Sequence, residues 1–332
     1  MTKQDSLMTT IYDVAREARV STATVSRVLN GRVVRAELRA RVMTAVEDLG
    51  YTPNGVARNL RRQTGSVWML IISDVESTYF TSLVRGVESV ASENGYSVVV
   101  CNSHDDPELE ARHIEVALAE QMAGVILSPS RPDTDVSRLS GRRVPVVTID
   151  RRLAAQATST VLVDNHAAAE AATSHLLDGG YKRIGCITGP RQISTAVERL
   201  EGYRRALAAR GLELDAALEL MENYREDGGY RGINALLALP EPPDAVLACN
   251  GLLAVGALRA LHDRGVAIPR DFGIVGFDDS PWSQVTNPPL TTVAQPTDAL
   301  GRKAAELLLA PEKLVSTHML STELIVRGSS RR

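Results

Sequence analysis

The 332-residue sequence lacks the features of a membrane or secreted protein. It has no run of about 18 apolar residues, so we expect no membrane-spanning helix. The first ten residues are polar and contain no apolar core of the kind that a secretory signal carries. Only three cysteines occur, Cys101, Cys186 and Cys249, and each lies in an apolar run far from the others. This pattern predicts reduced core thiols in a cytoplasmic protein.

Short catalytic motifs are also missing. The six histidines show no metal-ligand spacing with the cysteines or with each other. We find no P-loop, nucleophile elbow or dinucleotide fingerprint. We therefore expect no metal, no cofactor and no catalytic residue, which makes an enzyme the weaker alternative.

Charge is distributed unevenly along the chain. Residues 1–65 carry eleven basic and six acidic side chains, whereas the remainder carries 26 basic and 34 acidic ones. A basic N-terminal segment before an acidic remainder indicates that the N-terminal segment binds a polyanion. A charge difference of this size also suits an ordinary solvated surface.

The N-terminal segment has the pattern of three short helices. Thr10 and Asp13 can form reciprocal capping contacts at the start of the first helix. Ser21 can cap a second helix over residues 22–29, and a third is expected over 36–49 with Gly50 as its stop. A tight turn between the first two gives a helix-turn-helix layout.

From residue 66 the pattern changes to alternating strands and helices. Amphipathic segments at 80–94 and 252–264 predict helices that separate short apolar strands. The strands are expected at 67–72, 98–100, 125–127, 146–149, 184–187, 245–249 and 274–277. Such alternation predicts parallel sheets with helices on both faces, and about 265 residues of it suggest two α/β lobes.

Several motifs resemble the lactose-repressor (LacI) family. Residues 10–15 and 20–31 are similar to its headpiece, and 49–54 and 57–61 to its third-helix end and hinge. Residues 248–250, 276–279 and 288–296 are similar to its core, in the right order. The resemblance implies an all-α helix-turn-helix headpiece, a hinge helix and a two-lobed α/β core like the periplasmic binding proteins. The expected boundaries are 1–52 for the headpiece, 53–65 for the hinge, 66–163 and 293–323 for the N-lobe, and 164–292 and 324–332 for the C-lobe.

The resemblance implies that the second helix reads DNA. Arg27 can bond guanine bidentately, and the methyl groups of Thr22 and Ala23 suit thymine. Leu60 matches the hinge leucine that wedges into the minor groove. Arg35 stands where the family often has a capping serine, so Arg32 is the expected substitute for a phosphate contact in that loop. The expected DNA-binding residues are Ser21, Thr22, Ala23, Thr24, Ser26, Arg27, Asn30, Arg32, Tyr51, Asn54, Ala57, Arg58, Leu60 and Arg61.

A small-molecule effector is expected in the cleft between the lobes. Carboxylate, guanidinium and aromatic side chains together favour a sugar or related polyol, although each residue also suits a lobe–lobe ion pair or a core aromatic. The expected effector residues are Tyr79, Phe80, Arg199, Tyr230, Asn250, Asp278, Trp282 and Gln295.

The predicted function is a transcription repressor that leaves a pseudo-palindromic operator when its effector binds. Paired half-sites require a homodimer, and no leucine heptads follow the last expected strand, 323–326, to make a tetramer. A solute-binding protein for transport would share the core, but it would need an export signal where this chain has a headpiece. Effector identity, inducer or corepressor action, operator sequence and activation all stay open.

Overall fold

The computed structural model describes residues 9–29, 32–51, 65–155, 158–310 and 315–331. The chain forms two compact units, Met1–Gly65 and Ser66–Arg332, which are described separately. None of the described helices is long and apolar enough to cross a membrane. The expected residues Asn30, Asn54, Ala57, Arg58, Leu60 and Arg61 lie outside the described residues, as does the expected hinge over 53–65 except for its last residue.

The first unit contains three described helices around a small core. They are α1 (Ile11–Glu17), α2 (Thr22–Leu29) and α3 (Ala36–Asp48). One valine from each helix, Val14, Val25 and Val42, is completely buried in their shared core. The Arg41 guanidinium donates to the backbone carbonyls of Ala18 and Arg19, which holds the turn between α1 and α2 against α3. The predicted helix-turn-helix is therefore confirmed.

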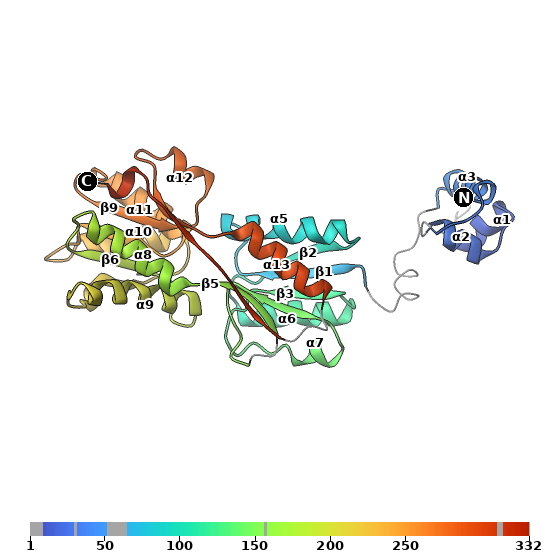
Figure 1. Ribbon diagram of the computed structural model, residues 1–332, viewed down its shortest axis with the longest axis horizontal. Helices are drawn as coiled ribbons and strands as arrows, with labels where there is room; N and C mark the ends of the chain where they lie inside the picture. Colours follow the sequence, from blue (N-terminus) through green and yellow to red (C-terminus); the bar gives the residue numbers. More distant parts are fainter. Residues whose placement is uncertain (1–8, 30–31, 52–64, 156–157, 311–314, 332) are drawn as a thin grey trace, which may run out of the picture. The chain divides into compact units, whose positions relative to one another are not determined.

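The N-lobe of the second unit is a six-stranded sheet in the order β11-β5-β4-β3-β1-β2, with helices on both faces (Figure 1). Helices α5 and α13 cover one face, and α6 and α7 cover the other. The strands are β1 (Val67–Ile72), β2 (Ser97–Asn102), β3 (Gly124–Leu127), β4 (Val146–Ile149), β5 (Ser159–Val163) and β11 (Thr317–Leu320). The helices are α5 (Thr78–Glu93), α6 (Pro107–Ala119), α7 (Ser137–Gly141) and α13 (Thr297–Leu309).

The C-lobe repeats this plan with the strand order β12-β10-β9-β8-β6-β7. Its strands are β6 (Ile184–Thr188), β7 (Glu219–Met221), β8 (Ala245–Ala248), β9 (Gly273–Phe277), β10 (Thr291–Ala294) and β12 (Glu323–Ile325). Its helices are α8 (Asn165–Asp178), α9 (Ser194–Ala209), α10 (Glu226–Leu237), α11 (Gly251–Asp263) and α12 (Pro281–Val285), with short 3₁₀ turns η1 (Ala216–Leu218) and η2 (Gly328–Ser330).

Strand burial fits the mostly parallel pairing of the two sheets, in which β12 alone among the described strands pairs antiparallel, with β10. Strands β3, β6, β8 and β9 are buried along their whole length, as expected for strands covered by helices on both faces. Helices approach each other closely where glycine allows it. Gly86 of α5 and Gly301 of α13 face the other helix, and a Cβ on either would lie 2.2 Å from a backbone carbonyl oxygen. Only glycine therefore fits at these two positions without a shift of the helices.

The chain crosses between the lobes at three places, and two expected boundaries need correction. Strand β10 pairs through Ala294 with Glu323 of β12 in the C-lobe sheet. Residues 293, 294 and 323 therefore belong to the C-lobe and not to the N-lobe, because strand pairing, and not sequence pattern, fixes the crossing. The N-lobe resumes with α13, and β11 ends at Leu320 before the chain returns.

Candidate functional site

The outer face of α2 is the first candidate site. Ser21 begins the helix by accepting the Thr24 N–H at 3.2 Å with its hydroxyl oxygen, so the predicted cap is present. Val25 and Val28 point into the headpiece core, which leaves Ala23 and Arg27 exposed on the other side. Thr22, Thr24 and Ser26 are half-buried beside them. This face can offer a methyl group and a guanidinium to base edges.

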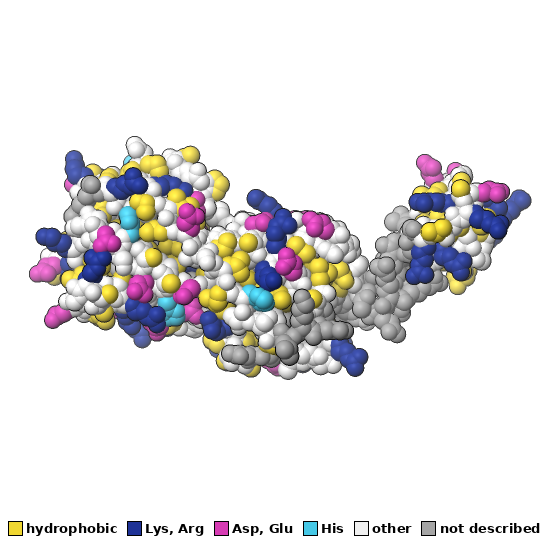
Figure 2. All heavy atoms as spheres, viewed as in Figure 1, with side chains coloured by type: hydrophobic (Ala, Val, Ile, Leu, Met, Phe, Trp, Pro, Cys, Tyr) yellow, Lys and Arg dark blue, Asp and Glu magenta, His cyan; other side chains and the backbone are white. Residues whose placement is uncertain are grey.

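Basic side chains are spread over the visible surface of the headpiece (Figure 2). All seven arginines among the described headpiece residues are exposed, and Arg16, with Asp13, makes the single ion pair described for them. The side chain of Arg35 makes no capping hydrogen bond at the start of α3. The exposed Arg32 is tied to α2, because its N–H donates to the Arg27 carbonyl at 3.0 Å.

Tyr51 has a second role that the sequence did not indicate. Its ring packs against the headpiece core, and its N–H donates to the Val46 carbonyl at 2.9 Å. A DNA contact by Tyr51 stays a prediction, and its packing also stabilises the headpiece core.

The second candidate site is a cleft that residues of both lobes line, at the carboxyl ends of the strands. Six of the eight expected residues are there: Tyr79, Phe80, Arg199, Asn250, Asp278 and Gln295. Five others complete the lining: Ser77, Asp150, Arg151, Thr195 and Tyr224. Groups that follow parallel strands meet at one edge of a sheet, which is where open α/β sheets bind ligands.

In the C-lobe, Arg199 and Asp278 form the polar floor of the cleft. Arg199 is 4% exposed, donates through Nε to Asn165 Oδ1 at 2.8 Å, and lies 4.2 Å over the Phe277 ring. Asp278 accepts the Gly251 N–H at 3.1 Å and the Gln295 amide at 2.7 Å. Burial raises the pKa of Asp278, which the nearby Arg199 charge partly opposes.

The neighbouring carboxylate has a different task. Asp279 forms a bidentate pair with Arg327, at 2.6 and 2.9 Å, and accepts from Thr292 at 2.7 Å. These contacts lower the pKa of Asp279 although burial opposes them. Of the two adjacent aspartates, Asp278 therefore faces the cleft and Asp279 fastens the C-terminal segment.

The N-lobe side of the cleft contains Tyr79, Asp150 and Arg151. Burial raises the pKa of the Tyr79 phenol well above its ordinary value, and the Asp150 and Asp278 carboxylates add to the shift. The phenol therefore stays protonated at neutral pH. Arg151 is 5% exposed, and its Nε lies 3.4 Å from Asp150 Oδ2.

Unsatisfied polar atoms are concentrated in this cleft. Among the described residues, four buried side-chain polar atoms make no hydrogen bond, and the residues that carry them all line the cleft. The atoms are Tyr79 Oη, Arg151 Nε, Tyr224 Oη and Gln295 Oε1. About 40 Å³ is open to water there, room for about three waters.

Two expected effector residues lie elsewhere. Tyr230 lies under Arg259, 4.9 Å from its guanidinium, and lines a separate hollow. Trp282 packs against the core beneath α10 and α11. Tyr230 is placed within α10, whereas Tyr224 lies between β7 and α10 and faces the cleft. The sequence signal that could have identified Tyr224 is its position shortly after the end of β7, because residues that follow strand ends line the cleft.

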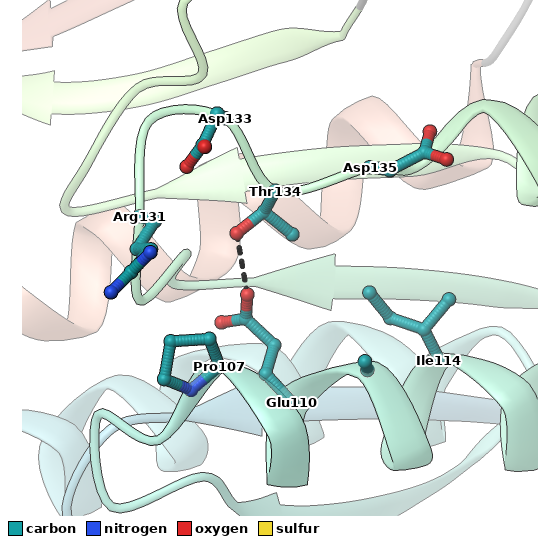
Figure 3. A pocket seen from close by; sticks show the side chains of 8 residues that line it. Pro107, Glu110, Ile114, Arg131, Asp133, Thr134 and Asp135 are labelled. Carbon is teal, nitrogen blue, oxygen red and sulfur yellow. Dashed lines mark hydrogen bonds between the residues drawn. The ribbon is translucent and has the colours of Figure 1, made fainter.

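A further hollow on the N-lobe has none of these unsatisfied groups (Figure 3). Glu110 rises from α6 toward the loop that carries Thr134 and accepts its hydroxyl at 2.6 Å. The same carboxylate accepts the Ser130 N–H at 2.7 Å and the Ser130 hydroxyl at 3.0 Å. Its hydrogen bonds hold a loop, so the cleft is the better ligand site.

Comparisons with known proteins agree with this architecture. The model of "Bacterial regulatory proteins, lacI family" matches residues 10–54, and that of the "Periplasmic binding protein-like domain" matches 173–330. "HTH-type transcriptional repressor CytR" of Escherichia coli (strain K12) is 35% identical over 99% of this chain and 98% of its own. "Ribose operon repressor" of the same strain is 36% identical over 97% of this chain and 100% of its own. The structure of the lac repressor dimer bound to operator and the anti-inducer ONPF matches with a TM-score of 0.87 and 26% identity, over 98% of this chain and 100% of that one.

Proposed function

This chain belongs to the LacI family of bacterial regulatory proteins, and we propose that it represses transcription by binding an operator as a homodimer. A small molecule that binds the cleft between the lobes releases it. The relatives are transcriptional repressors, which argues against an enzyme. A DNA-bound repressor of this kind works in the cytoplasm.

The exposed face of α2 supports the DNA-binding half of the proposal. A recognition helix in the major groove contacts base edges with its first residues, which here include Thr22 and Ala23, with Arg27 one turn later. The half-buried hydroxyls of Thr24 and Ser26 and the exposed Arg32 suit the flanking phosphates. A symmetric dimer would place two such helices on the two halves of a pseudo-palindrome.

One observation carries the effector half of the proposal. Among the described residues, each buried side-chain polar atom without a hydrogen bond belongs to a residue that lines the cleft. Buried polar groups in proteins are normally hydrogen-bonded, so four exceptions in one place indicate a ligand that supplies the missing partners. Two phenols, an amide oxygen and a guanidinium N–H match the mixed donors and acceptors of hydroxyl groups. The charges of the cleft are balanced, because two carboxylates, Asp150 and Asp278, lie with two arginines, Arg151 and Arg199. This balance favours a neutral ligand such as a sugar or polyol.

The proposal is tested by two measurements on the full chain. Selection of bound duplexes from a random DNA pool should return a pseudo-palindromic site. Titration of that site by fluorescence anisotropy, with a panel of neutral pentoses, hexoses, nucleosides and purine bases, should find a compound that weakens DNA binding. Failure to select any preferred sequence would overturn the regulator function. A compound that strengthens DNA binding would make the effector a corepressor.

A further inference from the structure

Two groups of ion pairs join the N-lobe to the C-lobe beside the effector cleft. Arg152 follows β4 in the N-lobe, and its Nη2 lies 3.9 Å from Glu198 Oε1 of α9 in the C-lobe. Arg225 precedes α10 in the C-lobe, and its Nη1 lies 3.9 Å from Asp74 Oδ2 and 3.7 Å from Glu76 Oε2 in the N-lobe. We call these groups the Arg152 site and the Arg225 site. None of these five residues is among those that line the cleft, so direct recognition of the effector does not account for them.

The two sites border the cleft. Four of the five charged residues are adjacent in the chain to a residue that lines the cleft. The adjacent residues are Arg152 and Arg151, Glu198 and Arg199, Arg225 and Tyr224, and Glu76 and Ser77. A change in the separation of the lobes therefore changes the distances across the two sites and the width of the cleft together.

The two sites have opposite polarity. At the Arg152 site the N-lobe carries the positive charge, whereas at the Arg225 site it carries the negative charges. The C-lobe presents the complementary pattern. Complementary charges fix the relative position of two surfaces and disfavour placements that bring like charges together. The pattern therefore favours one placement of the lobes, the one in which both sites are paired.

The strength of these contacts suits a reversible role. The arginine side chains are 55% exposed at the Arg152 site and 43% exposed at the Arg225 site, so water and salt screen both charges. Ion pairs within the C-lobe are shorter, for example 2.6 Å between Arg183 and Asp215. An exposed ion pair changes an equilibrium by about twofold to fivefold. Each site can therefore bias the placement of the lobes without locking it.

We propose that the two sites are electrostatic latches that favour the closed arrangement of the lobes, in which about 40 Å³ is open in the cleft. Opening of the lobes separates the charges at both sites, so the latches set the fraction of the protein that is closed before an effector binds. A ligand that prefers the closed arrangement is bound more tightly when this fraction is larger. Added salt should then weaken the binding even of an uncharged ligand. The inference rests on the proposed function for this regulation, but its test needs neither effector nor operator.

The test measures the separation of the lobes in the full-length protein by pulsed electron spin resonance. Nitroxide labels are attached through Arg112→Cys on α6 and Arg205→Cys on α9, which are exposed positions, one in each lobe. Cys101→Ser removes the half-buried native thiol, and the completely buried Cys186 and Cys249 stay. Dilution with unlabelled protein keeps the measured distances within one chain, and thermal melting of each variant reports folding.

Charge reversal weakens each latch without removing a residue that lines the cleft. Arg152→Glu places a carboxylate opposite Glu198, and Arg225→Glu places one opposite Glu76. Glu76→Arg, combined with Arg225→Glu, restores an attractive pair in the reverse order. Arg231→Glu is the matched control, because Arg231 lies on α10 close to Arg225 in the chain and its two ion pairs stay within the C-lobe.

In about 0.05 M salt, each single reversal should lower the ratio of short to long distances about twofold to fivefold. The combined reversal Arg152→Glu/Arg225→Glu should lower it by roughly the product of the two effects, since the sites share no residue. The swap of Arg225 with Glu76 should recover most of the wild-type ratio, and Arg231→Glu should keep it. About 1 M salt should shift the wild type toward longer distances.

An unchanged ratio in the combined reversal would overturn the inference. A swap that recovers nothing, or a control that moves as far as Arg225→Glu, would overturn it as well. If Arg152→Glu fails to fold, the Arg225 set alone decides. These outcomes would leave the regulator function standing, whereas failure to select an operator would leave the latches standing.

Discussion

Replacement of Asp278 by asparagine separates the charge of this residue from its shape. The two carboxylate oxygens accept from Gly251 N–H and from the Gln295 amide. An asparagine oxygen can keep the Gly251 contact, and its amide then faces Gln295. Gln295 can rotate its own amide so that its Oε1, which has no hydrogen bond among the described residues, accepts from the asparagine amide. We therefore expect the free energy of unfolding near neutral pH to change by no more than about 1 kcal/mol.

The pH dependence of this change has a definite sign. Burial raises the pKa of Asp278 in the folded chain above the unfolded value of about 4. A group with a raised folded pKa contributes stability that is present below the unfolded pKa and is lost as pH rises through the folded pKa. The asparagine side chain of the Asp278→Asn variant does not titrate. Urea unfolding at a series of pH values should therefore show the variant gaining stability relative to the wild type as pH rises from about 4.

The decisive assay is titration of the operator with and without the effector. Asp278→Asn should bind the operator without effector as the wild type does, since the cleft residue is in the second unit and the recognition helix in the first. It should lose the effector response, because a carboxylate that accepts from ligand hydroxyls is gone. A variant that responds like the wild type would refute the assignment of Asp278 to the ligand, and a variant that no longer binds the operator would show that Asp278 supports the fold.

Three further predictions follow from the same contacts. Arg199→Ala should lower the free energy of unfolding by about 1–3 kcal/mol in urea titrations, because it leaves Asn165 Oδ1 and the Cys249 carbonyl without the donor that they accept from, and an unchanged free energy would contradict this. Arg27→Ala should weaken the preferred operator by about 1–3 kcal/mol and flatten base preference at one symmetric position, whereas Arg39→Ala, the exposed control on α3, should keep the preference. Tyr224→Phe should weaken effector binding about tenfold, because it removes a phenol that lines the cleft; unchanged effector binding would refute that reasoning.

Local signals predicted the headpiece well. Ser21 caps α2 as expected, and Asp13 accepts from the Thr10 N–H at 3.0 Å. The expected helix over 22–29 has the observed bounds, and the one over 36–49 ends one residue earlier, at Asp48. Capping residues and apolar spacing act within a few residues, so one sequence suffices to find these elements. The long buried strands were predictable for the same reason, since covering helices require continuous apolar runs.

Side-chain direction and strand order were harder to predict. Tyr224 and Tyr230 are six positions apart, and which of them faces the cleft depends on where α10 begins, at Glu226. Asp150 and Arg151 were missed because a carboxylate and a guanidinium after a strand also suit a surface ion pair. Strands β7 and β12 have three residues each, and the four residues of β11 alternate between exposed and half-buried, so these strands are too short to show a clear periodicity in sequence. The assignment of 293, 294 and 323 to the C-lobe followed only from the pairing of β10 with β12.

The unsatisfied atoms of the cleft also give a physical basis for control by a ligand. A ligand shifts an equilibrium between two arrangements only by the difference in its binding free energy for them. Among the residues that the structure describes, four buried side-chain atoms without hydrogen bonds belong to residues that line the cleft, and each such atom costs about 1–3 kcal/mol until a partner satisfies it. A change from 1:99 to 99:1 requires about 5.5 kcal/mol of differential binding. Satisfaction of two or three of these atoms amounts to about 2–9 kcal/mol, a range that contains this requirement, and any coupling of ligand binding to DNA binding must be reciprocal.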